Sequence, residues 1–182
     1  MNHIDITLNK TATLLRIHRI TYSYLAIKMK PNTYTQLHIH LVFAVKFRKA
    51  LISPTWNHRL HEYIGGIIKY NKHQPLAINS MPDHIHILIG LNPNQAIADL
   101  IRCIKKDSTV FINKEKLSAS YFNWQEGYGA FSVSHSRLAI VANYIHQQQE
   151  QHKKLSFKKE YTSLLDKHNI QYNTAYLFQD PV

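Results

Sequence analysis

The sequence contains two His-x-His triplets, at residues 38–40 and 84–86, and histidine pairs at this spacing can do chemistry. Side chains two residues apart on a β-strand point to the same face, so each triplet would present two imidazoles side by side. Two neutral imidazoles on a rigid face form half of a site for a divalent metal ion. Because the chain has 13 histidines, such pairs also arise by chance, and the context must decide.

The context favours the second triplet. His84 and His86 follow the turn dipeptide Pro82-Asp83 and open an otherwise apolar segment, so we expect both imidazoles to be buried and to need polar partners. The first triplet lies inside a longer alternating segment, and we interpret it as part of the polar face of a sheet. Within that face, His40 is a candidate for a position near the same metal site.

A tyrosine and a glutamine four residues apart form the second candidate constellation, in the segment VANYIHQQQEQHKK. On a helix, Tyr144 and Gln148 would lie on one face. A phenol beside an amide oxygen suits a nucleophile next to a metal ligand. Most of the 11 tyrosines must have packing or surface roles, so this spacing alone is weak. Tyr128 is the competing tyrosine, but it lacks a glutamine four residues later, and we interpret it as a packing residue.

The elements that position these residues follow from periodicity. Apolar and polar residues alternate from Tyr34 to Lys46, which predicts a strand with one apolar and one polar face. Further strands are expected over 76–81, 84–91, 121–125 and 128–134, and helices over 54–70, from about 93, over 136–152 and over 156–168. This order predicts an α+β fold of the ferredoxin-like split βαβ type. Its antiparallel sheet would carry helices on one face, and a C-terminal helix would carry Tyr144.

Length and charge limit the classes of protein. The 182 residues suit one domain, which we place at 33–182, after a poorly ordered N-terminal extension at 1–32. The net charge is +11, and the chain after residue 30 keeps 17 basic against 10 acidic residues, so we expect a polyanionic partner. No apolar stretch is long enough to span a membrane, and the single Cys103 excludes an internal disulfide. We therefore expect a cytoplasmic protein.

Taken together, these motifs resemble a known family, the single-tyrosine HUH transposases of insertion sequences that move as single-stranded DNA (IS200-like transposases). PDHIHILI is similar to the His-hydrophobic-His strand of HUH nucleases, and YIHQQ is similar to the Tyr-x-x-x-Gln helix of the transposases. The stretches VKFRK and WQEGYGAFSVS and the tail from HKKLSF onward resemble the same family. The resemblance covers residues 33–178 and leaves the N-terminal extension unmatched.

The resemblance implies a mechanism and a substrate. His84, His86 and Gln148 would hold one Mg²⁺ or Mn²⁺, and Tyr144 would attack a phosphodiester to form a 5′-phosphotyrosine. The implied substrate is single-stranded DNA with short hairpins near the element ends. The implied assembly is a homodimer in which the tyrosine helix of one subunit completes the metal site of the other.

Basic residues near these motifs are candidate phosphate contacts, although any single lysine can equally serve solubility. They are Lys46, Arg48 and Lys49 after the first strand, Arg102, Lys105 and Lys106 on the second helix, and Lys153, Lys154, Lys158 and Lys159 after the tyrosine helix.

Two other functions stay open. One is a non-catalytic module of the same fold that binds single-stranded nucleic acid. Such a module needs aromatic side chains on the exposed face of the sheet, where the first strand instead offers His38, His40 and Lys46. The other is a host-adopted relative that still processes hairpins but no longer moves an element.

Overall fold

A computed structural model describes residues 34–152, 155–173 and 177, which lie almost entirely in the second of two compact units, residues 36–182. The predicted extension at 1–32 lies outside the described residues, as do Lys153 and Lys154. The elements are β1 (His38–Ala44), η1 (Lys46–Arg48), α2 (Asn57–Tyr70), β2 (Gln74–Met81), β3 (His84–Gly90), α3 (Ile97–Lys114), β4 (Gly129–Ser132), η2 (His135–Arg137), α4 (Leu138–His146), α5 (Gln148–His152) and α6 (Phe157–Lys167). Among the described helices, none combines the length and the apolar character that crossing a membrane requires.

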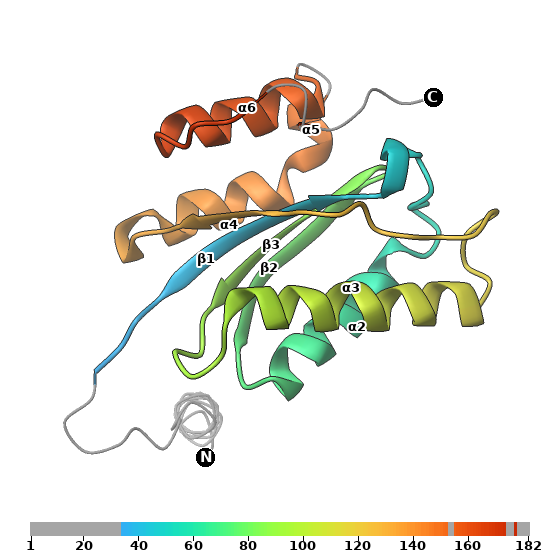
Figure 1. Cartoon of the computed structure of the whole chain (residues 1–182), viewed down its shortest axis with the longest axis horizontal. Coiled ribbons are helices and arrows are strands. Elements are labelled where there is room, and N and C mark those ends of the chain that lie inside the picture. Colours follow the sequence, from blue (N-terminus) through green and yellow to red (C-terminus); the bar gives the residue numbers. More distant parts are fainter. Residues whose placement is uncertain (1–33, 153–154, 174–176, 178–182) are drawn as a thin grey trace, which may run out of the picture. The chain divides into compact units, whose positions relative to one another are not determined.

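The four strands form one antiparallel sheet in the order β2-β3-β1-β4 (Figure 1). This order and the element sequence confirm the predicted α+β, ferredoxin-like fold. β3 lies inside the sheet, between β1 and β2, so its backbone is paired along both edges. In the register, His86 is opposite Val42 of β1 and Asn79 of β2.

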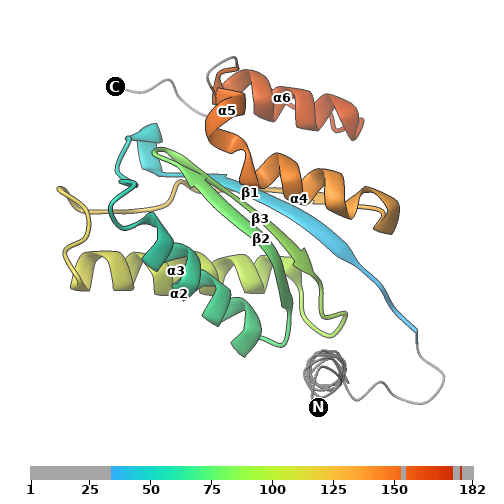
Figure 2. The ribbon, with the colours of Figure 1, turned by 180° about the vertical axis from the view of Figure 1, so that it is seen from behind.

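One face of the sheet is packed under α2 and α3 (Figures 1 and 2). The alternation predicted from the sequence places the odd-numbered residues of β1 and β3 on this face, because neighbouring side chains of a strand point to opposite sides. These residues form the main hydrophobic core with apolar residues of both helices. Those from the strands are Leu41, Phe43, Ile85, Ile87 and Ile89, and Val45, directly after β1, joins them.

The opposite face of the sheet carries the even-numbered residues, and α4 and α6 lie over it (Figure 2). Leu88 packs with Ile145 of α4, and Val42 packs with Phe157 and Tyr161 of α6. The tyrosine-bearing helix therefore covers the face that presents the histidines. The first two helices cover the other face.

Several predicted boundaries differ from the structure. The single helix expected over 136–152 is interrupted, because Gln147 leaves the helical conformation between α4 and α5 (φ −93°, ψ 18°). The strand expected over 121–125 makes one isolated bridge, from Trp124 to Val45. α2 begins at Asn57 rather than at Pro54, since the hydroxyl of Ser53 accepts a hydrogen bond from the backbone of Thr55 and forms a turn first.

Candidate metal and nucleophile site

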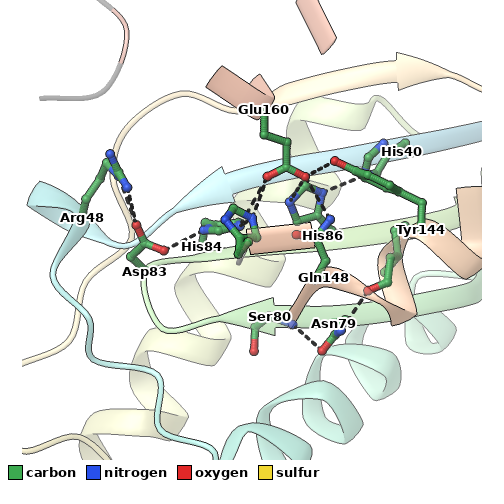
Figure 3. A network of polar contacts seen from close by, with 12 residues as sticks. His40, Arg48, Asn79, Ser80, Asp83, His84, His86, Tyr144, Gln148 and Glu160 are labelled. Carbon is green, nitrogen blue, oxygen red and sulfur yellow. Dashed lines mark hydrogen bonds and ion pairs between the residues drawn. The ribbon is translucent and has the colours of Figure 1, made fainter. Parts of the chain in front are cut away.

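The centre of the site is the pair His84 and His86 on β3. Both side chains are fully buried, and both point to the face of the sheet that α4 and α6 cover (Figure 3). Their rings lie 5.2 Å apart between centroids. The spacing of two residues on a strand thus produces the imidazole pair that the sequence predicts.

The ion pair of Asp83 and Arg48 orients His84. Nδ1 of His84 lies 2.7 Å from Oδ1 of Asp83, and Arg48 binds Oδ2 of the same carboxylate at 2.7 Å. Burial favours the protonated form of Asp83, but the hydrogen bonds and charges of His84 and Arg48 outweigh it and lower the pKa of Asp83 to about 2. An ionised carboxylate accepts a hydrogen bond from Nδ1–H of His84, which leaves Nε2 unprotonated and able to bind a metal ion.

His86 is oriented by His40, which the sequence places near the site. Nε2 of His40 lies 3.0 Å from Nδ1 of His86, and only 3% of His40 is exposed. Burial and the neighbouring His86 lower the pKa of His40 to about 3, so His40 is neutral and can accept the Nδ1 proton of His86. His38, by contrast, lies at the end of β1 opposite Gly90 and packs near His135. Of the first triplet, only His40 joins the site.

Tyr144 reaches the site because β2 holds the end of α4. Asn79, the neighbour of His86 on β2, donates hydrogen bonds from Nδ2 to the carbonyl oxygens of Ile145 at 2.8 Å and His146 at 3.2 Å (Figure 3). These carbonyls are among the last of α4, which have no partner within the helix. The ring of Tyr144 lies 6.2 Å from the ring of His86, edge to face.

Gln148 enters the site from the start of α5. Among the three consecutive glutamines, Gln147 and Gln149 are exposed and Gln148 is fully buried. Its Nε2 donates to Oε1 of Glu160 at 2.9 Å. The interruption at Gln147 does not separate Gln148 from Tyr144, because both side chains contact the same carboxylate.

Glu160 is a residue of the site that the sequence interpretation missed. α6 packs on the sheet through Phe157, Tyr161 and Leu165, and the helical spacing places Glu160 on this buried face. Its carboxylate accepts hydrogen bonds from Tyr144 and Gln148 on Oε1 and lies 2.8 Å from Nε2 of His152 on Oε2. A carboxylate on the apolar face of an amphipathic helix was the signal that could have indicated it.

His152 is the second missed residue, four positions beyond Gln148 in the sequence. Its Nε2 lies 3.1 Å from Nε2 of His84. His84, His86, His152 and Glu160 form a cluster whose ligand atoms all lie within 4.8 Å of one another. This cluster can hold a metal ion, since imidazole nitrogens and carboxylate oxygens are the ligands that divalent ions use in proteins.

Two buried atoms test whether a divalent ion fits. Among the described residues, Nε2 of His86 and Oε1 of Gln148 are buried side-chain atoms that lack a hydrogen-bond partner. Native proteins rarely leave buried polar atoms unsatisfied. Both atoms offer lone pairs, Nε2 of His86 because its Nδ1 faces the acceptor His40. Two of the three residues proposed from the sequence as ligands, His86 and Gln148, thus each carry an unpaired atom that a cation could satisfy.

The charges of the site oppose ionisation of the phenol. Burial, the negative charge of Glu160 and their hydrogen bond raise the pKa of Tyr144 above its ordinary value near 10. Burial alone would raise the pKa of Glu160, but the hydrogen bond with His152 and the nearby His86, whose Nε2 lies 3.5 Å from Oε1, lower it. In the chain by itself, Tyr144 is thus a protonated donor and Glu160 an ionised acceptor.

The basic residues proposed as phosphate contacts lie on different parts of the surface. Lys46 and Lys49 are exposed near the start of β3, whereas Arg48 is turned inward on Asp83. Lys105 donates hydrogen bonds from Nζ to the carbonyl oxygens of Gln125 and Gly127 and so stabilises this turn. Burial lowers the pKa of Lys105 to about 8. Arg102, Lys105 and Lys106 belong to α3, on the sheet face opposite the histidines.

Comparisons with known proteins identify the family. Residues 33–148 match the family model described as "Transposase IS200 like". The ISDra2 transposase TnpA of Deinococcus radiodurans is 30% identical over 139 residues, which cover 72% of this chain and 99% of that protein.

Two solved structures share the fold of this chain. A candidate transposase from Deinococcus radiodurans R1 has a TM-score of 0.53 at 24% identity, over 67% of this chain and 98% of that one. A REP-associated tyrosine transposase bound to a REP hairpin has a TM-score of 0.52 at 15% identity, over 70% of this chain and 75% of that one. From the family match and the relative, the chain belongs to the IS200-like transposases.

Proposed function

We propose that this transposase cleaves and rejoins single-stranded DNA at hairpin-flanked element ends, through a 5′-phosphotyrosine on Tyr144. One observation carries the proposal. The hydroxyl of Tyr144 lies in the same buried cluster as His84 and His86, where it contacts Glu160. A nucleophile beside a histidine pair that can bind a metal ion is an arrangement that can cleave a phosphodiester.

The residues that would hold the ion are His84, His86 and Gln148, and His152 and Glu160 lie close enough to complete its coordination. Bound there, Mg²⁺ or Mn²⁺ would polarise the scissile phosphate and offset its negative charge. The chain's own task is to hold the ligand atoms in place. Asp83 and His40 do this for His84 and His86, and Asn79 does it for the end of α4.

In the cleavage step, Oη of Tyr144 forms a bond to phosphorus and the bond from phosphorus to the 3′ oxygen breaks. The proton of the phenol leaves, and the departing 3′ oxygen takes up a proton to become a free 3′ hydroxyl. The new phosphotyrosine keeps the free energy of the phosphodiester, so a 3′ hydroxyl from another strand can reverse the step. Strand transfer then needs no external energy source.

Family membership and charge support the substrate. The chain carries a net charge of +11, and Lys46 and Lys49 are exposed beside the turn that leads into β3. The REP-associated relative of the same fold is bound to a REP hairpin. With six to eight phosphates contacted, we expect the logarithm of the binding constant to fall with the logarithm of salt concentration at a slope of roughly −4 to −6.

The proposal includes a homodimer with shared sites. Within one chain, Tyr144 already lies beside its own histidines. Sharing would require α4 of each subunit to take the place of the other, with the non-helical Gln147 at one end of the exchanged segment.

The decisive experiment is to capture the covalent adduct. Purified protein is incubated with Mg²⁺ and a panel of single-stranded hairpin DNAs from the flanks of its own gene, and adducts are separated on denaturing gels. Wild type should form an adduct. Tyr144→Phe should form none while hairpin binding persists, because the phenyl ring keeps the packing and removes only the hydroxyl.

Tyr128→Phe is the matched control, since Tyr128 is the competing tyrosine and precedes β4 outside the cluster. It should keep the adduct. An adduct that survives Tyr144→Phe and disappears in Tyr128→Phe would reject the assignment. Hairpin binding by wild type without any adduct across the panel would favour the non-catalytic binding module.

A further inference from the structure

A second surface, outside the histidine cluster, is built from residues that suit an unpaired nucleobase. The turn η1, the residues that follow it, and the segment 121–123 line a cavity of about 190 Å³. Its lining residues are Lys46, Phe47, Lys49, Leu51, Tyr121 and Asn123. Pockets for drug-sized ligands usually hold about 300–1,000 Å³, so this cavity suits one planar ring.

Two aromatic side chains stand exposed at this cavity. Phe47 is 43% exposed and Tyr121 is 74% exposed. Tyr121 is exposed because the segment alternates: Phe122 and Trp124 point into the main core, which turns Tyr121 and Asn123 to the other side. Exposed rings beside basic side chains are the usual platform on which bases of single strands stack.

The backbone holds the ring of Phe47 outward at a conformational cost. Phe47 and Arg48 have φ values of 57° and 51°, the left-handed region that bulky residues rarely adopt. This backbone conformation directs the side chain of Arg48 inward to Asp83 and leaves the ring of Phe47 partly exposed. Strained backbone at bulky residues is typical of functional positions, where the surrounding structure over-determines it.

The charge of the surface selects an anionic ligand. Lys46 and Lys49 are exposed at the cavity, and Nζ of Lys46 lies 5.3 Å from the centre of the Phe47 ring. Among the described residues that line the cavity, none is a carboxylate. An aromatic ring next to a phosphate fits both features, and a nucleotide in a single strand provides both.

The cavity is fixed to the turn that carries the metal-binding strand. The backbone amide of Lys46 donates to the carbonyl of Asn123 at 2.9 Å, and that of Val45 donates to the carbonyl of Asp83 at 2.8 Å. Arg48 bridges the same two parts through the carboxylate of Asp83. These contacts place the cavity beside the turn that leads into β3 and His84.

We propose that this surface is a stacking subsite for one unpaired base next to the cleaved phosphate, a role that rests on the proposed single-stranded DNA substrate. The base lies against Phe47 and Tyr121. Lys46 and Lys49 bind its flanking phosphates. The amide of Asn123, which can donate and accept, faces the edge of the base and gives the subsite its sequence preference.

The test measures binding in the absence of metal ions. The full chain in EDTA is titrated against a ten-residue single-stranded oligothymidylate with one central 2-aminopurine, whose fluorescence is quenched when it stacks. Phe47→Gly and Tyr121→Ala should each weaken binding about tenfold. Phe47→Trp should keep the affinity. Tyr70→Ala is the matched control, because Tyr70 is 88% exposed at the end of α2, and it should change the affinity less than twofold.

Phe47→Gly also separates binding from folding. Glycine accepts a φ of 57° without steric cost, so its melting temperature should equal or exceed that of wild type while its DNA affinity falls. Unchanged affinity in Phe47→Gly and Tyr121→Ala, or no binding of the oligonucleotide by wild type, would overturn the subsite. An equal loss of affinity for a blunt duplex would overturn it too, since a duplex offers no unpaired base.

A changed oligomeric state with unchanged DNA affinity, measured by light scattering, would assign the surface to a second copy of the chain and reject the subsite. None of these measurements involves the hydroxyl of Tyr144. The adduct assay therefore tests the proposed cleavage separately, and a failure of base stacking is distinguishable from a failure of cleavage.

Discussion

The hydroxyl of Tyr144 on α4 donates a hydrogen bond to Oε1 of Glu160 on α6. The same carboxylate binds the amide of Gln148 and lies 2.8 Å from Nε2 of His152, so one buried side chain contacts the proposed nucleophile and two candidate ligands. α6 is therefore part of the site and does more than cover it. Any change at Glu160 should affect the candidate metal ligands as well as the phenol.

Glu160→Gln should lower the affinity for Mn²⁺ by about 10- to 100-fold, the usual cost of losing a residue that orients or completes a metal site. The variant keeps the size of the side chain but removes the negative charge and puts a second amide beside Gln148. Isothermal titration calorimetry with Mn²⁺ measures the affinity without DNA. Glu115→Gln, at an exposed ion pair with Arg59, is the control and should bind Mn²⁺ like wild type. Equal affinity in Glu160→Gln and wild type would exclude Glu160 from the metal site.

Asp83→Asn should weaken Mn²⁺ binding by a similar factor, because Asp83 fixes the tautomer of His84. Asparagine can still accept the Nδ1 proton, but it loses the charge that stabilises this arrangement and that pairs with Arg48. The same calorimetric titration measures the effect. Asp99→Asn, which removes an exposed partner of Arg102, should leave the affinity unchanged. If both variants bind alike, His84 does not depend on the ion pair.

The sequence predicted the parts of the fold and site that follow from local periodicity. Strict alternation placed the histidines of β3 on one face, and spacing of four residues placed Gln148 near Tyr144. These patterns depend on the backbone of a single element, so they are visible without the tertiary structure. The prediction that His40 lies near the site also depended on alternation, and the register of β1 with β3 brings it to His86.

Glu160 and His152 could not be predicted in the same way. Their role depends on how α6 packs back over the sheet after the segment that follows His152, which no local pattern specifies. Glutamate on a helix is normally solvated, so its residue type alone favours a surface position. The interruption at Gln147 was hidden for a similar reason. Asn79 of β2 binds the last carbonyls of α4, and this contact joins residues 66 positions apart.

If each site combines residues from both subunits of the dimer, two inactive variants should restore cleavage activity when they are mixed. A mixture of Tyr144→Phe with the double variant His84→Ala and His86→Ala should regain cleavage, because an exchanged α4 brings an intact tyrosine to intact histidines. Each protein alone should be inactive. Adduct formation on hairpin DNA after mixing and equilibration measures the rescue. Absence of rescue would mean that each chain uses its own tyrosine.

Acid should destabilise the fold through His61, whose pKa is lowered to about 4 by burial and by the neighbouring His58. In the unfolded chain His61 becomes protonated below pH 6.5, whereas in the folded chain it stays neutral until about pH 4. Above pH 6.5, His61 therefore does not reduce the free energy of unfolding. As pH falls toward 4, protonation of His61 in the unfolded chain reduces it, by roughly 2 kcal/mol at pH 5. Ser80 lies 2.8 Å from Nε2 of His61 and holds the neutral ring.

Thermal unfolding followed by circular dichroism at pH 7 and pH 5, in EDTA, measures this dependence. His61→Asn should lose less melting temperature between the two pH values than wild type, by about 4–8 °C, because the difference isolates one imidazole. His135→Asn, at an exposed position, should follow the wild-type dependence. A pH dependence of His61→Asn parallel to that of wild type would show that protonation of His61 does not destabilise the fold.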